Sequence, residues 1–421
     1  MTSDGRPVLI LGGGINGAAI ARELVLNRVP VCVVDRADIG GGATAASSRL
    51  IHGGLRYLEY AEFRLVRESL AERERLLRLA PHFVRPLQFF IPVQRRASGF
   101  AVSAAKFFRS RLAGRFRSVP RGLWLVRAGL TLYDLSARKS SMPRHAVHRV
   151  GEPGVPPVDS KRFRWLCSYY DAQMEFPERF TVALLRDAER LAAEQSVWFR
   201  VFPYRESRMH RDVIELSPTA DGPRRGRKGP AAEPTRLEPA MIVNATGAWV
   251  DRTLAQLNVP SPQLIGGTKG SHFLTRHGPL REALGGRAIY AEASDGRPVF
   301  LLPLGPLSLV GTTDLPFDAD PSHAIADEEE LEYLLDATRR VFPHIPLTRQ
   351  DVDSHWAAVR PLPLHRSANP ASVTRRHLLE ENRDSPVPLV SLIGGKLTSC
   401  REVAEETAAL VLKRLGRKVE R

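Results

Sequence analysis

The stretch VLILGGGING, residues 8–17, decides how the chain begins to fold. Its four leading apolar residues are typical of a parallel strand that is buried on both faces. The strand runs into the glycine spacing Gly12-x-Gly14-x-x-Gly17, and residues 18–26 have the composition of a helix. A second apolar strand, residues 31–34, ends in Asp35, eighteen residues past the last glycine. This order of strand, glycine turn, helix and strand predicts an α/β fold that binds a dinucleotide.

Each position of the glycine motif has a physical reason. The first glycine permits a tight turn, the second lets the backbone approach a pyrophosphate, and the third lets the helix pack on the strand. The helix N-terminus, where Asn16 lies, stabilises an anion. The carboxylate of Asp35 is placed to bind a ribose hydroxyl. We therefore expect Gly12, Gly14, Asn16, Gly17 and Asp35 to hold the cofactor.

A loop of small and hydroxylated residues follows the second strand. It reads GGGATAASS at residues 40–48 and includes Thr44, Ser47 and Ser48. Small residues let a backbone lie close to a long ligand. An extended cofactor such as FAD would use this second loop, whereas NAD would not obviously need it. The alternative is a flexible loop without a ligand.

The composition is that of a globular protein. The 421 residues correspond to two or three domains, with 43% hydrophobic and 25% charged residues. The three cysteines, Cys32, Cys167 and Cys400, form no C-x-x-C pair, so we expect neither a disulfide framework nor a metal site. No uncharged apolar stretch reaches the ~18 residues of a membrane-spanning helix. Because the N-terminus also lacks the features of a signal peptide, we expect a cytoplasmic protein.

The predicted nucleotide-binding elements lie at both ends of the chain. Short buried strands are predicted at residues 241–244 and 389–393, and Gly394-Gly395 is expected to open a last helix that runs to about residue 415. Further helices are predicted at residues 63–79, 181–194 and 327–341. The cofactor domain must then be discontinuous. We assign to it residues 1–80, 160–260 and 355–421, and to a second, substrate-binding domain residues 81–159 and 261–354.

The stretch ASSRLIHGGLRYLE, residues 46–59, resembles the signature of FAD-dependent glycerol-3-phosphate dehydrogenases of the aerobic, quinone-linked type. Similar blocks follow in the family's order over nearly the whole chain: EFRLV at 62–66, AERE at 71–74, VNATGAW at 243–249, KGSH at 269–272, GTTD at 311–314, VRPL at 359–362 and GGKLT at 394–398. The resemblance implies a Rossmann-like FAD-binding domain, of the glutathione-reductase and D-amino-acid-oxidase type, with a second mixed α+β substrate domain.

The resemblance also implies a reaction. The C2 hydride of sn-glycerol 3-phosphate passes to flavin N5 and dihydroxyacetone phosphate leaves. The electrons then pass to a membrane quinone, or to oxygen in the oxidase branch.

The same blocks assign roles to individual residues by resemblance. The substrate ligands fall on Arg56, Tyr57, Arg375 and Lys396, and a phosphate does need several cations, best as guanidinium forks. Lys396 also follows two glycines at the expected start of a helix, which is a good anion site. Besides the residues of the first two loops, the cofactor ligands fall on His52, Gly53, Gly54, Thr246, Gly247, Trp249, Gly394, Gly395, Lys396, Leu397 and Thr398.

Hydride loss from C2 requires an acceptor for the hydroxyl proton. His272 is the first candidate and His52 the second, and the sequence leaves the choice between them open. Arg360 is expected to polarise the C2 oxygen and to stabilise its developing negative charge. For each histidine the alternative is an ordinary packed or surface role.

The chain departs from the family at several positions. Arg376-His377 stands where the family tends to have an acid and an aromatic, Cys400 replaces a usual Tyr, and Arg49 replaces Lys. The family usually has a further C-terminal helical domain, which we expect this chain, ending at Arg421, to lack. The extra cation leaves a more anionic or a larger phosphorylated polyol open as the substrate.

The net charge of +15 is concentrated in one region. Residues 75–133 contain twelve Lys or Arg and no acid, and nine of these lie in residues 95–127, interleaved with aromatic residues. Such a segment suits an anionic membrane surface, where a flavoenzyme that reduces quinone has to dock. Nucleic acid would also bind these cations, because its phosphates release counterions on binding, but it is the less favoured partner. We expect peripheral binding to the inner face of the cytoplasmic membrane, with a solvated basic face as the alternative.

Two other functions stay open. The same fold carries amino-acid oxidases, although an amino-acid carboxylate needs fewer cations than Arg56, Arg375 and Lys396 offer. An RNA-binding or tRNA-modifying flavoprotein would use the basic segment. The oligomeric state is also open, a homodimer included.

Overall fold

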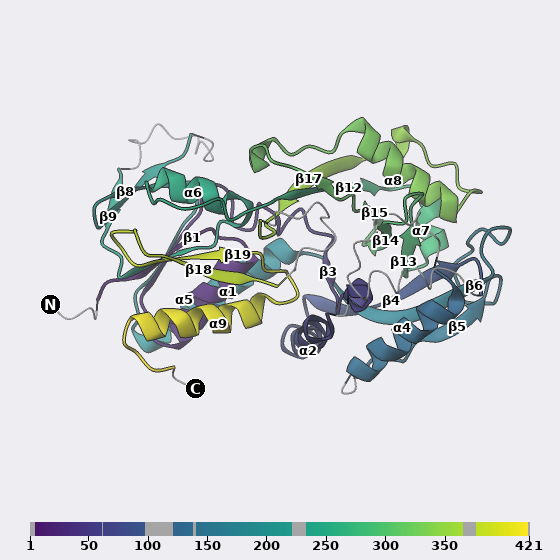
Figure 1. The fold of residues 1–421 in the computed structure, drawn as a ribbon, viewed down its shortest axis with the longest axis horizontal. Helices are drawn as coiled ribbons and strands as arrows, with labels where there is room; N and C mark the ends of the chain where they lie inside the picture. Colours follow the sequence, from purple (N-terminus) through teal and green to yellow (C-terminus); the bar gives the residue numbers. More distant parts are fainter. Residues whose placement is uncertain are drawn as a thin grey trace.

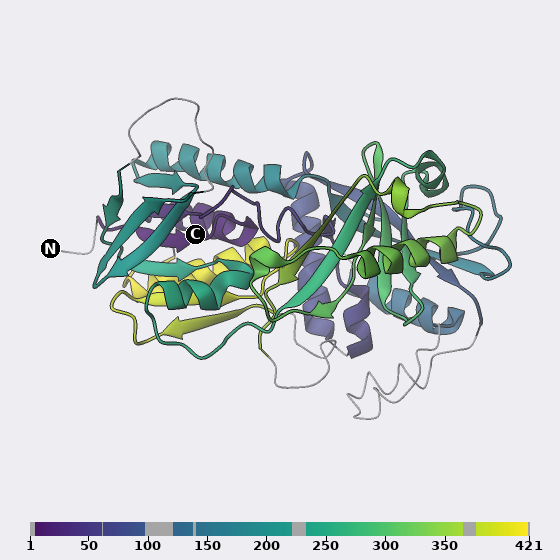
Figure 2. The ribbon, with the colours of Figure 1, turned by 90° about the horizontal axis from the view of Figure 1, so that it is seen from above.

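Two β-sheets lie side by side in the molecule, each covered by its own helices (Figure 1). The computed structural model describes residues 5–60, 62–96, 121–137, 140–220, 233–364 and 376–419. Seen from above, the two ends of the chain lie in the half that contains the first sheet (Figure 2). Both ends of the chain therefore contribute to one half of the molecule.

The first sheet has six strands in the order β18-β19-β11-β1-β2-β7. All neighbouring pairs are parallel except β18 with β19. The strands are β1 Val8–Leu11, β2 Val31–Val34, β7 Phe199–Phe202, β11 Met241–Asn244, β18 Leu378–Asn382 and β19 Leu389–Ile393. Every residue of β1, β2, β11 and β19 is buried, as expected for parallel strands with both faces covered.

Different elements cover the two faces of this sheet. One core joins it to the helices α1 Ile15–Leu26, α5 Pro177–Gln195 and α9 Cys400–Arg414. A second core joins it to α6 Val250–Gln256 and to a three-stranded antiparallel sheet of β8 Arg205–His210, β9 Val213–Pro218 and β10 Thr235–Leu237. The result is a three-layer α/β unit.

The second sheet has ten strands, eight of them in the order β16-β12-β15-β14-β13-β4-β6-β3, with β17 on β12 and β5 on β6. The strands are β3 Leu50–Ile51, β4 Val84–Val93, β5 Ala146–Arg149, β6 Trp165–Met174, β12 Thr268–Thr275, β13 Ala288–Glu292, β14 Pro298–Leu304, β15 Leu307–Gly311, β16 Leu315–Pro316 and β17 Ser354–Arg360. Two separate cores lie against it. One includes α2 Phe63–Leu79 and α4 Leu123–Ser136, and the other α7 Gly278–Leu284 and α8 Glu328–Val341.

Short 3-10 helices connect several of these elements. They are η1 Leu55–Tyr60, η3 Gly247–Trp249, η4 Pro321–His323 and η5 Arg349–Asp351. η1 follows β3 directly, and η3 follows β11. η3 contacts β17 of the second sheet, and η1 contacts α2 and α4.

The α/β class is confirmed, and so are the strands at residues 8–11, 31–34, 241–244 and 389–393 and the helix at 63–79. The last helix is a correction, because it begins at Cys400 and not after Gly394-Gly395. Both glycines have left-handed φ angles, +84° and +86°, which a helix cannot contain. Lys396 therefore lies in a loop and not at a helix N-terminus.

The domain division by residue ranges stays a prediction, but some strands cross it. β6 and β17 pair within the second sheet, although the sequence analysis placed residues 160–260 and 355–421 with the cofactor domain. Apolar runs of this kind predict strands and carry no signal for the sheet that a strand joins. The partner strands β4 and β12 decide it.

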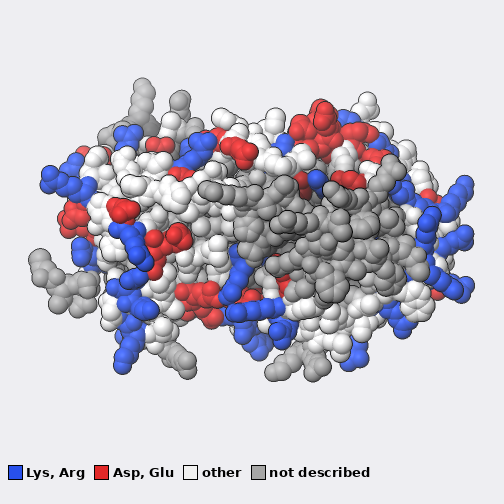
Figure 3. All heavy atoms as spheres, in the orientation of Figure 1, with Lys and Arg blue, Asp and Glu red and all other residues white. Residues whose placement is uncertain are grey.

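The surface charge and the composition of the helices bear on what the molecule can bind. On the face drawn in Figure 3, Lys and Arg gather at both ends and below the middle, and acidic side chains gather at the upper right and beside the lower basic group. Among the described residues, no helix combines the length and apolar character that a bilayer crossing requires. The part of the chain that the structure describes also contains no group of three His, Cys, Asp or Glu side chains placed to hold a metal ion.

Candidate active site

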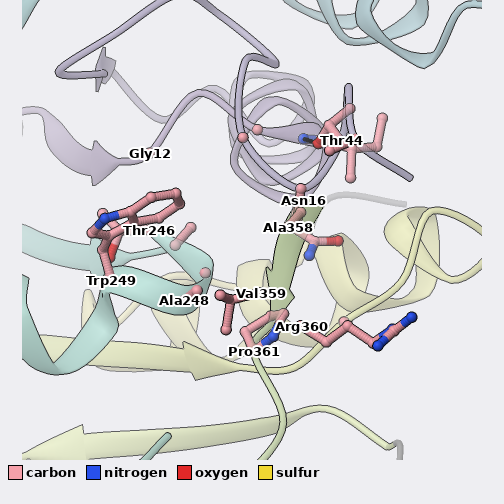
Figure 4. Close-up of a pocket in the computed structure, with 18 of the residues that line it drawn as sticks. Gly12, Asn16, Thr44, Thr246, Ala248, Trp249, Ala358, Val359, Arg360 and Pro361 are labelled. Carbon is pink, nitrogen blue, oxygen red and sulfur yellow. Dashed lines mark hydrogen bonds between the residues drawn. The ribbon is translucent and has the colours of Figure 1, made fainter. Parts of the chain in front are cut away.

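A pocket of about 690 Å³ opens at the carboxyl ends of β1, β2, β11 and β19 and reaches the second sheet. Figure 4 shows Gly12 and Asn16 at the start of α1, Thr246 and Trp249 after β11, and Arg360 at the end of β17, all bordering this pocket. Ligands of open α/β sheets bind at this edge, because the strand ends and helix N-termini converge there.

The glycine turn is required by close backbone contacts. Gly12 has a φ of +103°, and a Cβ on it would lie 2.5 Å from the carbonyl oxygen of Ala245. A Cβ on Gly17 would collide with the carbonyl oxygen of Gly12, so α1 packs directly on the turn. A Cβ on Gly14 would lie 3.5 Å from its nearest neighbour, Thr44 Oγ1, which is an ordinary van der Waals contact. Among the three motif glycines, Gly14 is thus the one at which an added Cβ would not collide with the described residues.

Side chains of the two predicted loops fix the turn. Thr44 Oγ1 accepts a hydrogen bond from the amide of Ile15 at 3.1 Å and so caps α1 from a distance of 29 residues. Asp35 accepts from the amides of Gly13 and Ala37, at 2.7 and 2.8 Å. Burial raises the pKa of Asp35 above its ordinary value, although the two amides oppose the shift. The motif is thus ordered by the protein's own contacts.

His272 on β12 is packed against the second of these loops. Its Nε2 lies 2.8 Å from Ser48 Oγ, and its ring stacks on Trp356 at 5.8 Å between ring centres. Trp356 Nε1 donates to the carbonyl oxygen of Ala46 at 3.2 Å. Burial, with help from nearby cations, lowers the pKa of His272 to about 3, so the ring is neutral at physiological pH. Trp356 supports His272 without lining the pocket, and the sequence analysis missed it, because only its pairing opposite His272 on β17 brings it here.

The loop after β3 is tied to the loop after β19. The amide of His52 donates to Thr398 Oγ1 at 3.2 Å. Gly54 has a φ of +75°, and the ring of Tyr57 lies so close that no side chain fits there. The ammonium of Lys396 lies 4.4 Å from the centre of the Tyr57 ring. Five predicted residues, from two segments that are far apart in the sequence, therefore meet in one place.

Arg360 is held at the junction of the two sheets. Its guanidinium donates to Asp314 Oδ1 at 2.9 Å, to Thr312 Oγ1 at 2.8 Å and to the carbonyl oxygen of Thr313 at 3.0 Å. Gly270 lies directly against it, since an added Cβ would collide with the guanidinium. Arg360 is thus fixed in orientation by β15 and its following loop.

A second cavity of about 170 Å³ adjoins the pocket. The residues that border both are Ser48, Leu50, His52, Tyr57 and Arg360. Four aromatic rings line the second cavity further on, from Phe89, Tyr169, Tyr290 and Phe300.

Most of the predicted residues are brought together at the pocket, and a few are not. Those that line the larger pocket are Gly12, Gly14, Asn16, Asp35, Thr44, Ser47, Ser48, His52, Tyr57, Thr246, Gly247, Trp249, His272, Arg360, Gly394, Gly395, Lys396, Leu397 and Thr398. Gly17 and Gly53 pack behind it, and Gly54 borders the smaller cavity. Arg375 and the side chain of Arg56 lie outside the described residues, and their predicted roles stay predictions. Arg376 does line the pocket, and His377 is buried against Glu406, 2.8 Å away.

Comparison with known proteins agrees with this geometry. The sequence pattern of the family described as FAD dependent oxidoreductase matches residues 7–382. The glycerol-3-phosphate dehydrogenase of Synechocystis sp. is 34% identical over 97% of this chain and 70% of its own length. The aerobic glycerol-3-phosphate dehydrogenase of Escherichia coli is 31% identical over 95% of this chain and 72% of its own. The chain belongs to the FAD-dependent oxidoreductases, in the glycerol-3-phosphate dehydrogenase family.

Solved structures of this flavoenzyme fold superimpose on the chain. A glycerol-3-phosphate dehydrogenase from Bacillus halodurans complexed with FAD matches with a TM-score of 0.67 at 21% identity, over 99% of this chain and 66% of that one. An L-alpha-glycerophosphate oxidase from Mycoplasma pneumoniae with FAD bound matches with a TM-score of 0.63 at 14% identity, over 98% of this chain and 95% of that one. The predicted fold and FAD as the cofactor are confirmed.

The pocket of this flavoenzyme fits FAD in its chemistry. Several buried polar atoms that border it have no hydrogen-bond partner among the described residues. They are Asn16 Oδ1, Arg49 Nε, Arg205 Nη1, His272 Nδ1 and Lys396 Nζ. Buried polar atoms are normally paired, so unpaired ones in a single pocket indicate a large polar ligand. Asp35 and the start of α1 both line this pocket. Their predicted contacts, with the ribose and the pyrophosphate, stay predictions.

Proposed function

We propose that this flavoenzyme oxidises sn-glycerol 3-phosphate to dihydroxyacetone phosphate. The observation that carries the proposal is Lys396, whose ammonium is buried over the Tyr57 ring without a hydrogen-bond acceptor among the described residues. A buried ammonium without a counter-ion is costly, and an anionic substrate group removes that cost. When bound, FAD supplies the acceptor for the hydride that leaves C2.

We place the substrate phosphate beside Lys396 and Tyr57. Arg56 and Arg375 are predicted as further phosphate ligands. In the sequence they directly precede Tyr57 and Arg376. Arg376 lines the same pocket, with its guanidinium 3.9 Å from the carboxylate of Glu406. Several cations at one point favour a phosphate over a singly charged carboxylate.

We assign the hydroxyl proton of C2 to His272. Ser48 borders both cavities and shares a hydrogen bond of 2.8 Å with His272 Nε2, so a proton that leaves the hydroxyl has a path through Ser48. The lowered pKa keeps the imidazole neutral, with a ring nitrogen free to accept, but it also makes the ring a weak base, so full proton transfer to it is uphill at physiological pH. Arg360 borders both cavities and stabilises the negative charge that develops on the C2 oxygen. His52 is the alternative acceptor, since it borders the same junction.

We further propose that the electrons pass to a quinone at the inner face of the cytoplasmic membrane. The support is the basic segment 95–127, in which nine Lys or Arg are interleaved with aromatic residues. Residues 97–120 of this segment lie outside the described residues. At its described end, Arg127 is exposed on α4 beside the exposed Trp124. Oxygen is the acceptor to test against quinone.

A related substrate is the second candidate. The D-erythritol 1-phosphate dehydrogenase of Brucella abortus is 31% identical over 94% of this chain and 72% of its own length. Together with the cation Arg376, this favours a four-carbon polyol phosphate as the alternative to glycerol 3-phosphate. Amino acids are less favoured, because a single carboxylate needs fewer cations than this pocket offers. RNA is also less favoured, because it would use the basic segment and not the pocket around Lys396.

Anaerobic flavin bleaching tests the proposal. We expect the FAD absorbance to bleach on addition of sn-glycerol 3-phosphate and to persist with glycerol or D-alanine. Readmission of oxygen or of a quinone then identifies the electron acceptor. FAD that stays oxidised with sn-glycerol 3-phosphate but bleaches with D-erythritol 1-phosphate would move the assignment to the larger polyol. Bleaching by D-alanine alone would overturn the proposal.

A further inference from the structure

Asp171 on β6 is a buried carboxylate that faces the smaller cavity. Its side chain is 3% exposed, and it lines the cavity that adjoins the flavin pocket. It is not part of any sequence block on which the expected active site rests. A buried carboxylate loses its hydration, so its charge has to be stabilised by hydrogen bonds or by a counter-charge.

One oxygen of Asp171 is fully occupied. Oδ1 accepts from Arg73 Nη1 at 2.7 Å, from the hydroxyl of Tyr133 at 2.7 Å and from the amide of Gly53 at 3.1 Å. Arg73 is itself 2% exposed and supplies the counter-charge. These three donors come from different elements and fix the rotation of the carboxylate. They also hold the backbone between His52 and Gly54.

The other oxygen, Oδ2, receives no hydrogen bond from the described residues. Asp314, the second carboxylate that lines this cavity, is paired with Arg360 at 2.9 Å. The cavity, which Arg297 and Arg360 also line, therefore offers a carboxylate oxygen of Asp171 as an acceptor, while the adjoining pocket offers the cation Lys396. A ligand between them meets opposite charges at its two ends.

We propose that Asp171 Oδ2 binds the hydroxyl of the substrate that is farthest from the phosphate, and so sets the orientation of the carbon chain. This inference rests on the proposed function. The phosphate goes to Lys396, the reacting carbon lies at the junction bordered by His52 and Arg360, and the distal hydroxyl donates to Asp171. An anionic group at that end is disfavoured, because a carboxylate only accepts hydrogen bonds and Asp171 offers it no donor.

Two substrate analogues test the inference on the wild-type holoenzyme. 1,2-Propanediol 1-phosphate, with the configuration of sn-glycerol 3-phosphate at the reacting carbon, lacks only the distal hydroxyl. We expect its rate of anaerobic flavin reduction divided by its apparent Kd to be about 10- to 100-fold lower, since a hydrogen bond to a charged group has that value. 3-Phosphoglycerate of the matching configuration carries a carboxylate at that end. It should compete with sn-glycerol 3-phosphate at least about 10-fold more weakly than 1,2-propanediol 1-phosphate does.

Two variants separate direct contact from damage to the buried cluster. D171N should reduce the discrimination between glycerol 3-phosphate and 1,2-propanediol 1-phosphate about 10-fold, because the charge is lost. Y133F removes a hydrogen bond from the same cluster without touching the cavity, and it should keep the full wild-type ratio. If D171N does not fold with FAD, the comparison of the two analogues on the wild type still decides.

Either of two results would overturn the inference while the proposed function stands. One is equal use of glycerol 3-phosphate and 1,2-propanediol 1-phosphate by the wild type, and the other is a D171N variant with an unchanged ratio. If glycerol 3-phosphate itself neither reduces the flavin nor competes, the proposed function has failed, and the inference falls with it.

Discussion

The ammonium of Lys396 lies 4.4 Å from the centre of the Tyr57 ring, although the two residues are separated by most of the chain. Tyr57 follows β3 of the second sheet, and Lys396 follows β19 of the first. The Nζ atom is buried and has no hydrogen-bond acceptor among the described residues. A cation held over an aromatic face between two sheets is prepared for an anionic ligand.

Replacement of Lys396 by Ala should raise KM for the phosphorylated substrate by about 10- to 100-fold, because a charged hydrogen bond to the phosphate is lost. Bound FAD should be largely retained. The measurement is steady-state kinetics together with the flavin content of the purified variant. Lys413→Ala, which removes an exposed lysine in the last turn of α9, is the matched control and should behave as the wild type. Loss of FAD with an unchanged KM would contradict the phosphate role.

The glycine turn predicts a contrast between two Gly→Ala variants. Gly12→Ala should destabilise the protein by at least about 2 kcal/mol, because a φ of +103° and the nearby carbonyl oxygen of Ala245 both exclude a side chain. Gly129→Ala should be neutral or stabilising by up to about 1 kcal/mol, because Gly129 lies within α4 with nothing near its Cβ position. Thermal unfolding of both variants gives the comparison. An unchanged Tm for Gly12→Ala would show that the turn tolerates rearrangement.

The elements at the ends of the chain could be predicted because their local sequence is sufficient. The four-residue runs at 8–11 and 31–34 are buried on both faces, and a continuous apolar run has no other stable environment. The last helix was placed too early, since the glycines at 394 and 395 look like a helix start in sequence and have left-handed φ angles in the structure.

Apart from the glycine turn, Asp35 and the loop at 40–48, the pocket residues were predicted through the resemblance and not through local physics. Ser48 and His272 are 224 residues apart, and only the packing of β12 against the loop at 44–48 brings them together. Trp356 and Asp171 were missed for the same reason. Trp356 depends on the register of β17 against β12, and Asp171 depends on the pairing of β6 with β4. Such long-range pairings have no short-range signal in a single sequence.

His272 should make the stability of the protein depend on pH. Its pKa is about 3 in the fold and near the ordinary 6.5 in the unfolded chain, so between these values the unfolded state binds a proton that the folded state does not. The free energy of unfolding should therefore fall by up to about 1.4 kcal/mol per pH unit as the pH drops below about 6, from this residue alone.

Urea unfolding of the wild type and of His272→Gln at several pH values measures this contribution. The difference between the two should be constant above pH 7, where the imidazole is neutral in both states, and should change in favour of the variant at lower pH. Parallel curves over the whole pH range would show that folding does not lower the pKa of His272.

Four arginines of the basic segment should determine membrane binding. Arg109, Arg111, Arg115 and Arg117 lie outside the described residues, and the expectation rests on their sequence pattern alone. Replacing all four with Gln should weaken binding to vesicles that contain phosphatidylglycerol by at least about 100-fold, since each cation near an anionic surface contributes about 1 kcal/mol. Co-sedimentation gives the affinity. The matched control carries the same change at four exposed arginines elsewhere, namely Arg64, Arg186, Arg236 and Arg276. If the control loses as much affinity as the first variant, net charge and not this segment binds the membrane.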